Sequence, residues 1–139
     1  MIKECIFVDV FTNSPYAGNQ LAVFPHAENL NSEQMQRLAN EINYSETTFI
    51  FNANDQNTDF EIRIFTPKMQ VPFAGHPTLG TAFAIAKITD LWLNKKGFLR
   101  LKTKVGVIPV DFKDDVVWMK QNKPEFLKQY TIKKRSPIL

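Results

Sequence analysis

The chain has 139 residues, about the size of one domain, and 44% of them are hydrophobic, which is typical of a folded protein. No apolar run approaches the roughly 18–20 residues of a membrane-spanning helix, and acidic residues within the first apolar run indicate a strand rather than a signal peptide. The net charge of +3 comes from residues 120–139, which hold six basic residues and one acidic residue. A nucleic-acid-binding domain would carry its basic patch on the fold itself, so we expect no binding to nucleic acid. Without a membrane-spanning run or a signal peptide, the expected protein is globular and cytoplasmic and does not bind a membrane.

The first two predicted strands, residues 3–11 and 20–25, form a hairpin with a long polar connection. Apolar residues alternate along the first of them, which places Ile6, Val8 and Val10 on one face of a sheet. The connection is rich in Asn, Ser, Pro and Gly, as expected of a loop.

A helix is predicted to follow, beginning after Asn31 and ending near Asn43. Asn31 is a favourable N-cap residue, and Gln34 stands three residues later, as in a capping box. Helical spacing predicts one buried face, formed by Met35, Leu38, Ala39 and Ile42. Residues 45–51 and 60–65 are then predicted to be two further strands joined by a polar turn.

Residues 75–78, Gly-His-Pro-Thr, form a predicted corner before a second helix that ends near residue 88. Pro77 suits the first helical position, where its missing N–H costs nothing. His76 would then stand one residue before the helix, and Gly75 would let another group approach the backbone closely. The N-terminus of this helix is a candidate anion site. Its predicted buried face consists of Leu79, Ala82, Phe83 and Ala86.

Three more strands are predicted, at residues 99–103, 107–112 and 116–120, after which the pattern fails. We therefore predict a domain over residues 1–123 and a basic, irregular tail over residues 124–139. The fold class is α+β, with a curved, mostly antiparallel sheet wrapped around the second helix.

Three residues are candidates for chemistry on position alone. Glu46 stands at a junction between a helix and a strand, where burial would suit a general base. His76, beside a helix start, is well placed to donate to an anion or to move a proton. Asn19 follows Gly18 in a turn, where Asn is also a common structural residue.

Several other chemistries are not expected. Two histidines and one cysteine cannot form a closed zinc site of the usual ligands, and neither a phosphate-binding loop, a dinucleotide motif nor a nucleophile elbow is present. We therefore expect neither a metal ion nor a cofactor. Cys5 lies in the first strand and is interpreted as a small core side chain, because one cysteine cannot form an internal disulfide.

Five segments in order, VDVFT, GNQLAVF, NYSETTFIF, RIFTP and VPFAGHPTLGTA, resemble the PhzF-like isomerase family of phenazine biosynthesis. The resemblance spans about residues 4–121 and implies a fold similar to that of diaminopimelate epimerase. It also implies cofactor-free proton transfer on a small carboxylic acid.

The resemblance assigns roles to individual residues. The glutamate of the Ser-Glu-Thr-Thr junction, here Glu46, is a proton-transfer residue. The corner lines the substrate pocket, which makes His76 a second catalytic candidate and Gly75 a substrate-binding one. Thr78, in the same corner, and Asn19, by likeness to the related epimerases, complete the predicted substrate-binding set.

The resemblance covers only the N-terminal half of such a protein, whose active site lies between two similar halves. We therefore expect a site that is incomplete without a second half, supplied by another chain or by a second copy in a homodimer. The alternative is a catalytically inactive domain that has kept the fold and binds an anion or a protein partner.

Overall fold

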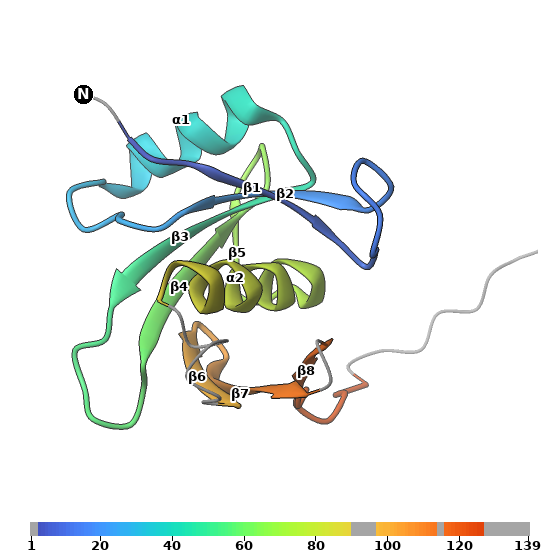
Figure 1. The fold of residues 1–139 in the computed structure, drawn as a ribbon. Helices are drawn as coiled ribbons and strands as arrows, with labels where there is room; N and C mark the ends of the chain where they lie inside the picture. Colours follow the sequence, from blue (N-terminus) through green and yellow to red (C-terminus); the bar gives the residue numbers. More distant parts are fainter. Residues whose placement is uncertain (1–2, 90–96, 114–115, 127–139) are drawn as a thin grey trace, which may run out of the picture.

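The computed structural model describes residues 3–89, 97–113 and 116–126. Figure 1 shows a curled sheet that partly encloses one helix, with a second helix on its outer side. The elements in chain order are β1 (Ile6–Val10), β2 (Asn19–Phe24), α1 (Ser32–Ile42), β3 (Glu46–Asn52), β4 (Phe60–Phe65), β5 (Gln70–Val71), α2 (Gly75–Ile88), β6 (Phe98–Thr103), β7 (Gly106–Lys113) and β8 (Val116–Met119). No helix in this described part of the chain is both long enough and apolar enough to span a membrane.

The strands form one sheet in the order β1-β2-β3-β4-β6-β7-β8, with β5 paired to β4. Five of the pairings between described strands are antiparallel, which confirms the predicted mostly antiparallel sheet. The other two, β2 with β3 and β4 with β6, are parallel. Each parallel pair is joined through a helix, α1 or α2, because parallel neighbours need a long crossover connection. The short strand β5 was not predicted, since two residues carry no periodic signal.

The alternation of apolar residues along the strands separates two hydrophobic clusters. The inner cluster packs around α2 and includes Leu21, Val23, Ile50, Ile62, Ile64, Ile85, Leu99, Leu101, Ile108 and Val110. The outer cluster lies beneath α1 and includes Phe24, Leu30, Met35, Ala39, Phe49 and Phe65. Ile6 and Val8 pack against the inner cluster, while Cys5 packs against the outer one, as the alternation predicted. Cys5 is only half-buried and lies just before β1, so it is at the edge of the core and not within it. Burial raises the pKa of its thiol, which therefore stays protonated.

The first helix has the predicted capping box. The Asn31 side chain accepts a hydrogen bond from the Gln34 N–H at 2.9 Å, and the Gln34 side chain accepts one from the Asn31 N–H at 3.0 Å. Asn43 ends the helix in the left-handed conformation, with φ of 57°, which asparagine tolerates better than most residues.

Replacing Asn31 by Ala is expected to lower the free energy of unfolding by about 1 kcal/mol, because the Gln34 N–H in the first turn of α1 loses its acceptor. Urea titration measures the loss. Glu41→Ala, at an exposed position of the same helix, serves as the control. Equal losses in the two variants would contradict the role of the cap.

The second helix differs from its prediction in two respects. It begins at Gly75, so Pro77 is the third helical residue and His76 lies inside the first turn. Proline is tolerated there because the first N–H groups of a helix have no partner within it. The helix is also buried on more than one face, including Thr78, Gly80, Thr81, Ala84 and Ile85, because the sheet curls around it.

Gly80 brings α2 close to the sheet. A Cβ atom at this position would lie 2.6 Å from Leu21 Cδ2 and 2.7 Å from Val10 Cγ2, so a larger residue would push the helix away from β1 and β2.

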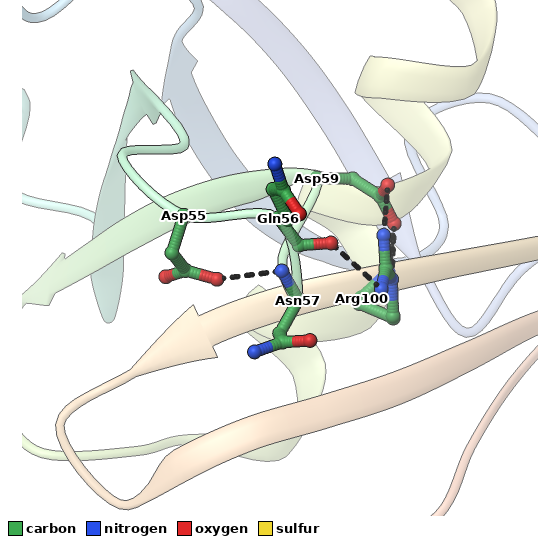
Figure 2. Close-up of polar contacts among 5 residues, drawn as sticks. All are labelled: Asp55, Gln56, Asn57, Asp59 and Arg100. Atoms are coloured by element: carbon green, nitrogen blue, oxygen red, sulfur yellow. Dashed lines mark hydrogen bonds and ion pairs between the residues drawn. The ribbon is translucent and has the colours of Figure 1, made fainter.

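A polar cluster connects the β3–β4 turn to β6 (Figure 2). The Asp59 carboxylate accepts hydrogen bonds from the Arg100 main-chain N–H at 2.7 Å and from its guanidinium at 3.0 Å. The same guanidinium donates to the Gln56 carbonyl at 3.3 Å. These contacts secure the short parallel pairing of β4 with β6, and Asp59 accordingly raises the pKa of Arg100.

Asp55, in the same turn, is expected to make the free energy of unfolding depend on pH. Its side chain accepts a hydrogen bond from the Asn57 N–H, which lowers the pKa of the carboxyl from its ordinary value of 3.8. A carboxyl whose pKa is lower in the folded state stabilises the fold above its ordinary pKa, and that contribution disappears as the pH falls through the lowered value. We therefore expect Asp55→Asn to be less stable than the wild type at neutral pH, with the difference shrinking in acid. A difference that grows on acidification, in urea titrations at several pH values, would contradict this.

The predicted division at residue 123 stays a prediction. Residues 120–126 have no regular secondary structure, and most of the proposed tail, residues 127–139, lies outside the described residues.

Candidate active site

The predicted site residues gather at one end of the curled sheet. In the parallel pairing of β2 with β3, Leu21 lies opposite Glu46, so Asn19 and Glu46 are at the same end of adjacent strands. The first turn of α2, with Gly75 and His76, meets this end of β3. Residues that are up to 57 positions apart in the chain, Asn19 and His76, therefore belong to one region.

Glu46 and His76 are in direct contact. The Glu46 Oε2 atom lies 3.4 Å from His76 Nδ1, and the side chains are 20% and 9% exposed. Glu46 is the first residue of β3 and projects to the same side as Thr48 and Ile50, which face α2. The alternation along β3 thus directs the carboxylate toward the helix and not toward solvent on the outer face.

The second nitrogen of the imidazole is buried and available. His76 Nε2 has no hydrogen-bond partner among the described residues. The Phe11 ring lies beside the imidazole, with ring centroids 6.4 Å apart. Phe11 is 73% exposed and has φ of 65°, an uncommon conformation for a bulky residue, immediately after β1.

The N-terminus of α2 has little neutralising charge of its own. Its N-cap, Ala74, provides no side-chain hydrogen bond, and the first turn contains no acidic residue. The positive end of the helix dipole therefore acts on Glu46 and on whatever binds beside it. A Cβ at Gly75 would lie 3.4 Å from Met119 Cε, an ordinary contact, so none of the described residues approaches Gly75 unusually closely.

Asn19 and Thr78, the other two predicted substrate-binding residues, are placed differently. Asn19 is exposed, and its Oδ1 atom accepts a hydrogen bond from the Ser45 hydroxyl at 3.4 Å, next to Glu46. Thr78 is fully buried, and both its hydroxyl and its N–H donate to the Ala74 carbonyl, at 2.8 and 3.3 Å. Substrate binding by Thr78 stays a prediction that these two contacts do not support.

Sequence reasoning missed three residues at this end of the sheet: Phe11, Met119 and Gln121. Met119 and Gln121 approach Gly75 from the end of β8, 44 or more positions away along the chain. No local pattern could have identified them, because the return of β8 to the start of α2 depends on the curl of the sheet. Phe11 lies within the motif VDVFT, but its positive φ is visible only in the structure.

The arrangement suits proton transfer. A carboxylate and an imidazole are both groups that act as general acids or bases, and these two are in contact and largely sheltered from water. Among residues 3–89, 97–113 and 116–126, no three His, Cys, Asp or Glu side chains are grouped in a way that could hold a metal ion.

Comparison with known proteins agrees with the predicted fold and family. A trans-2,3-dihydro-3-hydroxyanthranilate isomerase from Pseudomonas aeruginosa is 45% identical over 104 residues, which cover 75% of this chain and 35% of that protein. The chain therefore spans about a third of the length of the relatives that it matches.

Solved structures show the same resemblance. A putative phenazine biosynthesis PhzC/PhzF protein from Clostridium difficile superposes with a TM-score of 0.73 at 28% identity, over 84% of this chain and 42% of that one. A hydroxyproline epimerase from Agrobacterium vitis, at 12% identity over 83% of this chain and 40% of that one, has a TM-score of 0.61 and shows the fold alone. Since the model of the PhzC-PhzF family, described as phenazine biosynthesis-like protein, matches residues 8–137, this chain belongs to that family.

Proposed function

We propose that this chain forms one side of the active site of an isomerase that moves a proton within a small carboxylic acid. Glu46 acts as general base and then as general acid, and His76 assists it. The observation that supports this assignment is the sheltered 3.4 Å contact between the Glu46 carboxylate and the His76 imidazole at the start of α2.

In the proposed reaction, Glu46 removes a proton from a carbon whose electron pair is delocalised into an adjacent unsaturated system. The proton then returns to a different carbon of the same molecule, so the product is an isomer and no oxidant or cofactor is consumed. His76 donates through Nδ1–H to the Glu46 carboxylate and orients it, while Nε2 is available to the substrate. General acid–base steps of this kind contribute about 10²–10⁴-fold to a rate.

The substrate class follows from the helix terminus and from the relative's name. A helix N-terminus with free N–H groups favours an anion, and a substrate carboxylate fits this requirement. The substrate named for the Pseudomonas aeruginosa relative, a dihydro-hydroxyanthranilate, is a ring carboxylate with adjacent unsaturation. We propose an acid of this kind for the present chain.

The proposed activity needs a second surface on the far side of the substrate. The described residues supply Glu46 and His76 from one side, and the matched relatives are about three times as long as the matched part. We propose that a second half completes the site, provided by another polypeptide segment or by a second copy of this chain. A carboxylate left open to water would keep a low pKa and would be a poor base.

One experiment tests this function. The purified chain is incubated in D₂O with dihydroanthranilate-type ring acids over a range of protein concentrations, and deuterium incorporation is followed by mass spectrometry. Sedimentation over the same range gives the fraction of dimer. An exchange rate per chain that rises with the dimer fraction supports the proposal.

A monomer that catalyses no exchange at any concentration would reject enzyme activity for this chain on its own. The same outcome would favour the alternative function, an inactive domain that binds an anion or a protein partner. The exposed Phe11 ring beside His76 is the observation that favours this alternative, because it offers apolar surface at the edge of the site.

A further inference from the structure

Two threonines join the strand that carries Glu46 to the helix that carries His76. The hydroxyl oxygens of Thr48, in β3, and Thr81, in α2, lie 2.8 Å apart. Both residues are 0% exposed. A buried hydroxyl without a partner is unfavourable, so this hydrogen bond favours one alignment of α2 on β3.

The threonine contact and the Glu46–His76 contact are separated by nearly the same distance along β3 as along α2. Glu46 precedes Thr48 by two residues, which is about 7 Å along a strand. His76 precedes Thr81 by five residues, which is about 7.5 Å along a helix axis. Strand residues two apart share a face, so both β3 side chains project toward α2. The two contacts are therefore successive links between the same strand and the same helix.

Because the links share their elements, the position of one determines the position of the other. A shift of α2 by a single residue would move the helix by about 1.5 Å and rotate it by about 100° relative to β3. Such a shift would separate the two hydroxyls and would also carry the imidazole away from the carboxylate. Gly80 already lies so close to Leu21 and Val10 that α2 has little room to move further toward β1 and β2.

We infer that Thr48 and Thr81 are positioning residues that hold the Glu46 carboxylate against the His76 imidazole. The purpose of this positioning rests on the proposed function, but the positioning itself is testable without a substrate. Thr47, the neighbour of Thr48, offers a natural comparison. It is equally buried, alternates to the outer side of β3, and its hydroxyl has no hydrogen-bond partner among the described residues.

The test uses the ring signals of His76 in proton NMR at a fixed pH. The chain has two histidines, so His26→Gln assigns the signals. The quantity measured is the change in the His76 Cε1–H chemical shift that Glu46→Gln produces. It is compared in the wild type, in the double variant Thr48→Val/Thr81→Val, and in Thr47→Val. Replacing both hydroxyls by methyl groups of the same shape leaves no unpaired partner, so the double variant is expected to fold.

We expect Glu46→Gln to shift the His76 signal in the wild type and in Thr47→Val by the same amount, and by less than half as much in the double variant. Thr48→Ser, which keeps a hydroxyl, is expected to retain the full response.

An undiminished response in the double variant would overturn the inference, and so would an equal reduction in Thr47→Val or the absence of any response in the wild type. If the double variant does not fold, the single variant Thr48→Val provides the same comparison, because the Thr81 hydroxyl is able to turn to a carbonyl of its own helix. None of these outcomes depends on catalysis, so a failure of the proposed function would be recognised separately in the exchange experiment.

Discussion

Glu46→Gln is expected to reduce deuterium exchange into the substrate acid by about 10²–10⁴-fold, because the amide is unable to accept the proton. The substitution keeps the size of the side chain and leaves an oxygen that can face His76 Nδ1, so the local geometry should persist. The measurement is the initial rate of deuterium incorporation under conditions in which the wild type exchanges.

The matched control is Glu41→Gln, the same chemical change at an exposed position of α1. It is expected to leave the exchange rate unchanged. If Glu46→Gln lowered the rate less than threefold, Glu46 could not be the group that moves the proton, and the catalytic assignment would have to be abandoned.

Phe49→Ala is expected to lower the free energy of unfolding by about 3–5 kcal/mol, the usual cost of removing a large aromatic side chain from a core. Phe49 is 0% exposed and lies at the centre of the outer cluster. Its ring stacks on Phe24 at 5.0 Å and meets the edge of Phe65 at 5.4 Å. The substitution therefore removes the contacts that hold neighbouring strands β2, β3 and β4 together beneath α1.

Urea titration provides the measurement, with Phe126→Ala as the control. Phe126 is 95% exposed, and its removal should change stability by no more than about 0.5 kcal/mol. Similar losses in the two variants would show that the cluster beneath α1 contributes little to the fold.

Much of the local structure was predictable because each signal lies within a few residues. Alternation along β1 placed Ile6, Val8 and Val10 on one face correctly, and the pair Asn31 and Gln34 identified the start of α1. The start of α2 was placed two residues too late because Pro77 is compatible with several positions of a first turn.

The pairing of strands could not be predicted in the same way. Whether β2 lies beside β3, and β4 beside β6, depends on how two helices cross the sheet, and no short segment encodes that. The burial of α2 on several faces is a consequence of the same curl. The strand β5, in contrast, forms a local hairpin with β4 and is too short to give a periodic signal.

For the site, the sequence alone was sufficient to nominate Glu46 and His76, since each stands where one element joins the next and both lie in motifs of the resemblance. Only the tertiary structure decided that they touch, because their contact requires α2 to lie along β3 in one alignment. It likewise decided that Phe11 and Met119 lie nearby while Thr78 turns its hydroxyl into the helix. Local patterns in the sequence indicate which face of an element a residue occupies. The packing of the sheet around its helix determines which residues from distant elements meet on that face.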